Sequence, residues 1–141
     1  MKIIKLFLRF AIASSFLSAV ADRLGYWHEN VSVWGNWKNF LTYTQAINPW
    51  FSANLIPMVG LTATIAEVVF AICLLIGFKT ELFAKLSGFL LLIFALSMMF
   101  SSGIKGAFDY SVLSAAAAAF ALSTMSSYKY LEVDTILNSK K

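Results

Sequence analysis

The chain has 141 residues, of which 60% are hydrophobic and only 13% charged, with a net charge of +4 and a mean hydropathy of +0.76. A soluble globular domain is excluded, because such domains are far less apolar, and the composition predicts an integral membrane protein. The basic residues are spread along the chain and do not form one patch, which argues against nucleic acid and favours membrane lipid as a partner.

Four apolar runs are long enough to cross a bilayer, because a hydrocarbon core of about 30 Å needs about 20 helical residues. They cover residues 3–21, 59–78, 82–100 and 108–125. We therefore predict a single membrane domain over residues 1–141, folded as an all-α, integral membrane four-helix bundle. The first run also fits a cleavable secretory signal, because it ends in Ala19-Val20-Ala21, although Arg9 interrupts its apolar stretch.

The segment between the first two runs contains all four tryptophans of the chain, which is typical of a membrane interface. Apolar side chains recur there at steps of three and four over residues 33–48, which predicts an amphipathic helix. Asn36 could cap its start, and Asn48-Pro49 should end it. We expect an interfacial helix that serves either as a simple membrane anchor or as a lid over the bundle. Its candidate lid residues are Trp34, Trp37, Phe40 and Trp50.

In the second run, Glu67 is the only charged residue, and a carboxylate at that depth costs about 2.5 to 3.5 kcal/mol unless it faces a protein interior. Thr64 lies on the same helical face, so we expect both side chains to point inward. The first run has a comparable stripe of small and polar residues that includes Ser14 and Ser18, and it is also expected to face inward.

Arg9 is the candidate partner of Glu67, because no other basic residue lies inside a run and away from its edges. Two alternatives stay open. Arg9 could extend to the cytoplasmic surface, and Glu67 could be a protonated carboxyl group with a structural role. As a functional group, Glu67 would handle protons or orient a ligand.

Basic residues also predict the orientation of the chain, because cytoplasmic flanks carry an excess of Lys and Arg. The side that holds both termini and the turn after residue 78 collects Lys2, Lys5, Arg9, Lys79, Lys85, Lys129, Lys140 and Lys141. The other side holds Arg23, Lys38 and Lys105. Both termini are therefore predicted to be cytoplasmic, and we expect no catalytic role for the polar tail 126–141.

Several chemistries are disfavoured by residue counts alone. Cys73 is the only cysteine and His28 the only histidine, so an intramolecular disulfide, a C-x-x-C redox centre and a bis-histidine haem cannot form. Neither a phosphate-binding loop nor a nucleophile elbow is present. We predict no metal site and identify no catalytic residue.

Short motifs along the chain resemble the DoxX family of small four-helix membrane proteins. They are Leu8-Arg9 in the first run, Ala66-Glu67 in the second, Leu74-Leu75-Ile76-Gly77-Phe78-Lys79-Thr80 at its exit, and Asp109-Tyr110-Ser111 at the start of the last. Family members often carry Gly and Lys near the outer end of the first helix, where this chain has Asp22-Arg23-Leu24-Gly25.

The resemblance implies a multi-pass protein of the bacterial cytoplasmic membrane. The family is named by similarity to a subunit of a thiosulfate:quinone oxidoreductase, and some members are linked to thiol or oxidant defence. No catalytic residue is implied, but Arg9 and Glu67 match the family's recurrent intramembrane charges.

We therefore predict a non-catalytic accessory or anchoring subunit of a quinone- or thiol/sulfur-linked membrane redox complex. It would bind no redox cofactor alone, receive a quinone around Glu67 under the lid, and assemble with a soluble or membrane oxidoreductase or with further copies of itself. The alternatives are a small proton-linked transporter or lipid-binding bundle that uses Glu67, and a structural membrane scaffold.

Overall fold

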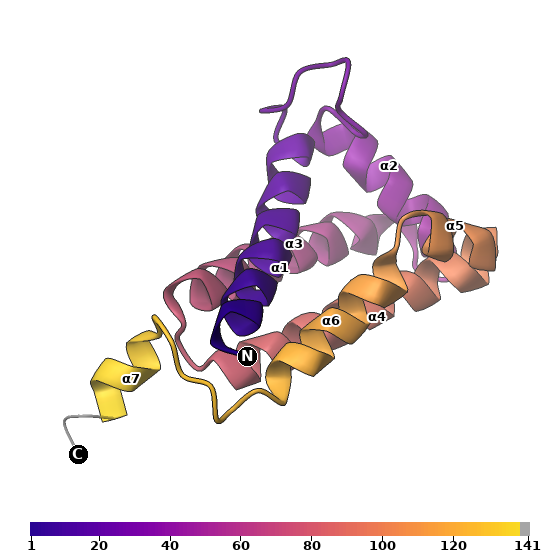
Figure 1. Cartoon of the computed structure of the whole chain (residues 1–141). Helices are drawn as coiled ribbons and strands as arrows, with labels where there is room; N and C mark the ends of the chain where they lie inside the picture. Colours follow the sequence, from indigo (N-terminus) through magenta and orange to yellow (C-terminus); the bar gives the residue numbers. More distant parts are fainter. Residues whose placement is uncertain (139–141) are drawn as a thin grey trace.

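The computed structural model describes residues 1–138, and all regular structure in this part of the chain is helical (Figure 1). Lys140 and Lys141, counted above with the basic flank, lie outside the described residues. The elements in chain order are α1 (Lys2–Arg23), α2 (Trp37–Ile47), the short 3-10 helix η1 (Ala53–Leu55), α3 (Ile56–Ile76), α4 (Thr80–Ser102), α5 (Ile104–Asp109), α6 (Val112–Ser123) and α7 (Val133–Asn138).

Three helical segments are long and apolar enough to cross a membrane: α1, η1 together with α3, and α4. The helices α1, α3 and α4 match the first three predicted runs to within three residues at each end. Their outer surfaces carry large exposed apolar side chains, including Ile3, Phe7, Ile65 and Ile93. Such a surface is unfavourable in water and suits lipid, so the fold is that of a membrane protein.

The fourth predicted run, 108–125, is not one continuous helix. The chain turns at Tyr110 and Ser111, where Ser111 adopts a left-handed conformation with φ of 55° and its N–H bonds to the Phe108 carbonyl at 2.9 Å. Helix α6 therefore begins only at Val112 and has 12 residues, which corresponds to about 18 Å. Asp109 and Ser111 are short polar residues that favour turns by local hydrogen bonding. Hydropathy did not reveal the break, because the average over the run stays apolar despite these two residues.

Helix α4 packs mainly along α6, and α1 along α3, while α3 and α4 join the two pairs. The shared core contains Ile12, Ala13 and Phe16 of α1 together with Leu74 of α3 and Leu122 of α6. Contact between α4 and α6 is close at Gly88, where a Cβ would lie only 2.8 Å from the ring of Phe120. Small residues that permit such approach are the main route to helix association in lipid.

The helices meet further segments of the chain at two ends of the molecule, the turn end and the lid end. At the turn end, the start of α1 lies near the Gly77–Lys79 turn and the tail 126–138. At the lid end, α2 crosses from the end of α1 toward α3 and α4 (Figure 1).

Helix α2 has the predicted cap and the predicted end, but it is shorter than the predicted segment 33–48. The Asn36 side chain accepts a hydrogen bond from the Asn39 N–H at 2.9 Å, so the predicted cap is confirmed, and the helix ends at Ile47, before Asn48-Pro49. It starts later than the predicted residue 33, because Gly35 has a φ of 71° that does not fit a helix.

Candidate functional site

The intramembrane carboxylate Glu67 pairs with Arg23 at the end of α1. Nη2 of Arg23 lies 2.9 Å from Oε2 of Glu67, and Nη1 donates to the hydroxyl of Thr64 at 2.8 Å. The two charged side chains are only 3% and 2% exposed. Glu67 and Thr64 thus face the interior, but the predicted pairing of Glu67 with Arg9 is wrong.

Arg23 was not predicted as the partner of Glu67, because it lies two residues beyond the predicted end of the first run, at a position counted as a membrane edge. In the structure α1 continues through Arg23, so the residue stays on a helical face and turns inward. A signal was present, since Arg9, Phe16 and Arg23 are seven residues apart and therefore share one face of a helix. All three are buried.

Aromatic rings close the ion pair off at the lid end. The guanidinium carbon of Arg23 lies over the Phe40 ring at 4.0 Å from its centroid and over the Trp34 ring at 5.3 Å. Such placement favours a cation electrostatically. Phe40 reaches this position because Gly60 of α3 has no side chain: a Cβ there would lie 2.7 Å from Leu41 and 3.1 Å from Phe40.

Not all predicted lid residues take part equally. Trp34 and Phe40 lie over Arg23, and Trp37 packs on Phe40 with ring centroids 5.2 Å apart. Trp50 is half exposed and lies outside this cluster. The lid over the charged pair therefore consists of Trp34, Trp37 and Phe40.

Asp22 holds the chain that leads into the lid. Its carboxylate accepts hydrogen bonds from the hydroxyl of Ser32 and from the backbone N–H groups of Val33 and Trp34, the last two at 3.0 and 2.9 Å. Adjacent residues of α1 thus have separate tasks: Asp22 fixes the loop before α2, and Arg23 fixes the rings above Glu67.

The far end of α2 is attached to α4 by a buried polar contact. The hydroxyl of Ser97 donates to the side-chain oxygen of Asn48 at 3.0 Å, and the Asn48 amide donates to the Thr44 carbonyl at 2.9 Å. On the same helix, burial raises the pKa of the Tyr43 phenol, and nearby Tyr110 adds to the rise, so the phenol stays neutral at physiological pH.

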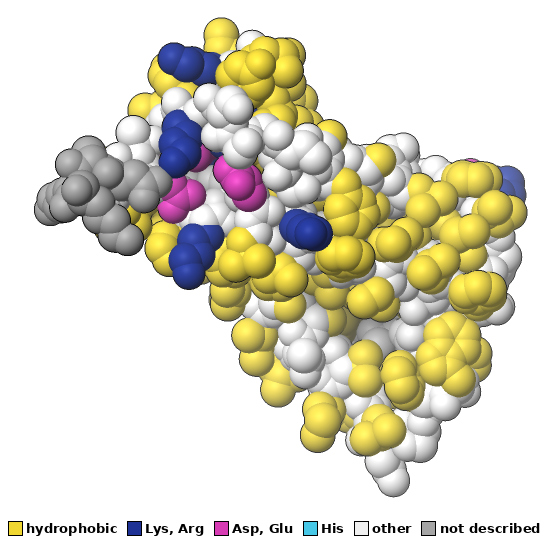
Figure 2. All heavy atoms as spheres, turned by 90° about the horizontal axis from the view of Figure 1, so that it is seen from below, with side chains coloured by type: hydrophobic (Ala, Val, Ile, Leu, Met, Phe, Trp, Pro, Cys, Tyr) yellow, Lys and Arg dark blue, Asp and Glu magenta, His cyan; other side chains and the backbone are white. Residues whose placement is uncertain are grey.

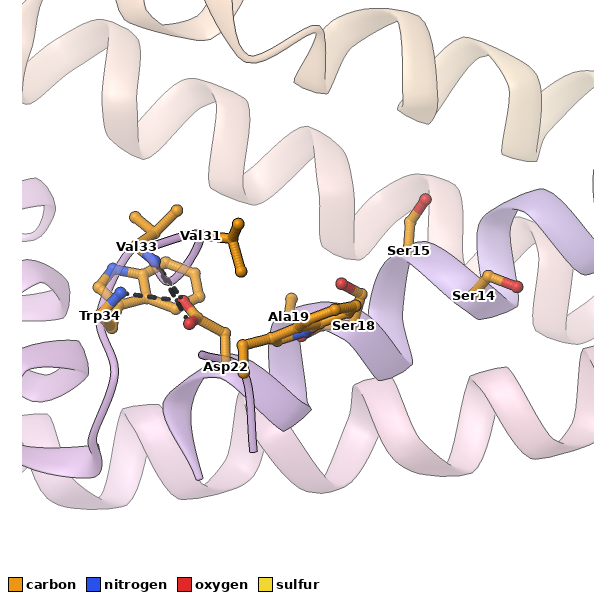
Figure 3. Close-up of a pocket in the computed structure, with 9 residues that line it drawn as sticks. Ser14, Ser15, Ser18, Ala19, Asp22, Val31, Val33 and Trp34 are labelled. Carbon is orange, nitrogen blue, oxygen red and sulfur yellow. Dashed lines mark hydrogen bonds between the residues drawn. The ribbon is translucent and has the colours of Figure 1, made fainter. Parts of the chain in front are cut away.

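A groove of about 600 Å³ runs beside the lid along α1 (Figure 3). It is lined by Ser14, Ser15, Ser18, Ala19, Asp22, Trp27, Val31, Val33 and Trp34. Figure 3 shows the three serines along α1, with Asp22 and Trp34 at one end of the groove. The predicted inward position of Ser14 and Ser18 is wrong: both are exposed and line this groove, because the buried face of α1 carries Arg9, Phe16 and Arg23 instead.

Arg9 belongs to a second charged cluster at the turn end. Its guanidinium is 1% exposed and donates to the carbonyls of Leu74 and Leu75, both at 2.8 Å, and of Tyr130 and Leu131, both at 3.0 Å. The first two carbonyls end α3 and have no further helical turn to bond to. Arg9 therefore caps α3 and holds the tail, with its guanidinium bound to protein carbonyls.

The tail supplies the negative charges of this cluster. Oε1 of Glu132 lies 2.7 Å from Nζ of Lys5 and 3.9 Å from Arg9. Asp134 accepts from the backbone N–H groups of Lys79 at 2.9 Å and Thr80 at 3.2 Å, so it caps the start of α4. The sequence did not point to either acid, because the tail 126–141 was expected only to be polar and without a catalytic role. The opposite charge of these acids to Lys5 and Arg9 was the available signal.

Within residues 1–138, no three His, Cys, Asp or Glu side chains lie close enough to hold a metal ion together. Comparisons with family models, with curated proteins and with solved structures find no match to this chain. The chain's own residues provide three candidate features: a sealed ion pair, a lid above it, and an open groove beside the lid.

Proposed function

We propose that this chain is a DoxX-like protein of the bacterial cytoplasmic membrane that serves as an accessory or anchoring subunit of a quinone- or thiol/sulfur-linked redox complex. The groove beside the lid carries the proposal, because it offers a lipid-soluble ligand a place next to a rigid charged core. The chain itself would be non-catalytic, and its partner a soluble or membrane oxidoreductase.

The proposed arrangement is a four-helix bundle with both termini in the cytoplasm. Helix α6 is short, but α5 and α6 together extend from Ile104 to Ser123. In the proposed arrangement these two helices would form the fourth crossing, with one turn in it. An even number of crossings returns the chain to the side where the basic residues gather, in agreement with the positive-inside rule. Helix α2, with its tryptophans, would then lie in the outer membrane interface.

A quinone is the proposed ligand of the groove. Ligand sites are typically about 300 to 1,000 Å³, mostly apolar, with a few polar groups that orient the ligand. The groove combines apolar walls from Val31, Val33 and Trp34 with the exposed hydroxyls of Ser14 and Ser18. Those hydroxyls would donate to the ring carbonyls, and a lipid-soluble ring could enter sideways from the bilayer.

We propose this groove as the ligand site. The sequence alone suggested a different position, around Glu67. The space beside Glu67 is filled by Arg23, with Phe40 above it. The same contacts weaken the proton-linked transporter as a proposal, because Glu67 has a direct cationic partner and is 1% exposed. Lipid binding in the groove and a purely structural scaffold are the remaining competitors, and the two experiments below separate them.

Recovery of a redox enzyme with the tagged chain is the expected result of purification from membranes in mild detergent. Mass spectrometry should find a flavin, thiol or sulfur oxidoreductase in stoichiometric amount, because an anchoring subunit binds its enzyme permanently. The control is a parallel purification under the same conditions, in which an unrelated tagged four-span membrane protein is the bait. Recovery of the chain alone, or only of further copies of itself, would contradict the accessory-subunit proposal.

Filling the groove should abolish quinone binding. Titration of decylubiquinone into the purified protein is expected to quench Trp27 and Trp34, and Ser18→Phe should weaken the apparent affinity at least about tenfold, or about 1.4 kcal/mol. Ser114→Phe is the matched control, since Ser114 is an exposed serine on α6, away from the groove. Equal quenching in all three proteins would mean partition into detergent, and competition by phospholipid alone would indicate a lipid site.

A further inference from the structure

The tail contacts the bundle through its charged groups and leaves its apolar side chains outside. Glu132 is buried and Asp134 is half-buried, while Leu131 is 67% exposed and Leu137 is 50% exposed. Tyr128 and Tyr130 are exposed as well. A segment that docks on a soluble protein does the reverse, because burial of apolar area is the usual driving force.

The docking is specific, because the backbone of the tail is held at several points. Arg9 bonds to the carbonyls of Tyr130 and Leu131, and the N–H of Asp134 donates to the Gly77 carbonyl at 3.2 Å. Gly77 leaves no space above it: a Cβ there would lie 2.6 Å from Cα of Glu132.

Leu131 shows that this contact fixes the orientation of the tail. It has a φ of 49°, a left-handed conformation that is costly for a leucine and persists only where surrounding contacts impose it. In that conformation the carbonyl reaches Arg9, the next residue turns its carboxylate toward Lys5, and the leucine side chain stays outside. The exposed apolar side is therefore held in place by the fold.

Basic side chains surround this end of the molecule. Lys2, Lys79, Lys85 and Lys129 are all exposed. Figure 2, seen from below, shows Lys and Arg side chains, with Asp and Glu side chains among them, at the end that carries the tail, next to the wide apolar surface of the helices. Lysines beside exposed Tyr and Leu are typical of a segment that rests on anionic headgroups.

We propose that residues 128–137 form a membrane-surface anchor. Glu132 and Asp134 fasten the segment to α1, α3 and α4, and its tyrosines and leucines enter the headgroup region of an anionic bilayer, where the neighbouring lysines meet lipid phosphates. The anchor fixes how deeply the turn end sits in the membrane. It is independent of the quinone groove, which lies at the other end of α1.

Site-specific labelling in vesicles tests the anchor. Leu137→Cys in a Cys73→Ala background carries an environment-sensitive fluorophore, and the full-length protein is reconstituted in phosphatidylcholine with or without phosphatidylglycerol. The label should be quenched by lipids that carry a shallow spin label, more strongly with phosphatidylglycerol and less at high salt. Thr135→Cys is the matched control, because it is also exposed but lies about 200° away around α7.

Equal quenching of the two labels, or none at either position, would overturn the proposal. Protection of Leu137 only in native membranes that contain other proteins would overturn it too, and would assign the apolar side to a protein partner. A third protein, Glu132→Gln with the Leu137→Cys label, should lose part of the difference from Thr135→Cys, because its tail keeps the backbone contacts but loses the ion pair with Lys5. If that variant does not fold, the comparison of the first two labels still decides the question.

Discussion

Replacing Glu67 by alanine is expected to destabilise the protein by about 3 to 5 kcal/mol, because it leaves the guanidinium of Arg23 buried without a counter-charge. The pair is almost fully shielded, and Arg23 would keep only uncharged partners in direct contact: the Thr64 hydroxyl, the Ala19 carbonyl and the two aromatic rings. Thermal unfolding of the purified protein in mild detergent measures the change. The Arg23→Ala variant should be affected similarly, since it strands the carboxylate instead.

A double replacement provides the control for this result. Arg23→Met together with Glu67→Leu removes both charges and roughly keeps the volume, so most of the lost stability should return. Removal of the exposed pair Lys105 and Asp109, which lies along α5, should change nothing measurable, because surface pairs contribute little. If Glu67→Ala keeps full stability, the pair is not structural. If Glu67→Gln folds normally but loses quinone binding, Glu67 has a functional role that the geometry does not suggest.

Replacing Arg9 by alanine is expected to cost about 3 kcal/mol or more and to release the tail. Four carbonyls lose their donor, two at the end of α3 and two in the tail, and hydrogen bonds to charged groups contribute about 1.5 to 3 kcal/mol each. Stability in detergent and trypsin cleavage after Lys129 are the two measurements. Both should change together, because the same side chain holds the helix end and the tail.

Arg9→Lys distinguishes geometry from charge at this position. An ammonium keeps the charge but has no planar fork of donors, so it cannot reach carbonyls on α3 and on the tail at the same time. We expect the variant to lose a large part of the stability that Arg9→Ala loses. Lys85→Ala is the matched control, because Lys85 is an exposed basic residue on the neighbouring α4. Wild-type stability of Arg9→Lys would show that charge alone is sufficient.

The long apolar helices could be predicted because their signal is local. Hydropathy over about twenty residues depends only on composition within the run, and it placed α1, α3 and α4 correctly to within three residues. The cap of α2 was equally local, since Asn36 bonds to a backbone group three residues away. The break before α6 was missed because a single left-handed residue, Ser111, hardly changes an average over such a window.

Partner choice among the charges could not be predicted in the same way. Arg9 and Glu67 were singled out by their isolation within apolar runs, and both are indeed buried. Their partners, however, were residues at the edges: Arg23 just past one run, and Glu132 in the tail. A long arginine side chain reaches several ångströms along the helix axis, so depth counted from run ends does not decide which charges meet.

The sequence by itself determined that this protein belongs in a membrane, which segments form its long helices, and that charges inside them must be paired, because these follow from the cost of transferring polar groups into lipid. The tertiary structure decided the pairs. Only the packing of α1 against α3 sets Arg23 beside Glu67, and only the return of the tail brings Glu132 to Lys5. These contacts depend on the relative rotation and offset of distant segments, which no local pattern encodes.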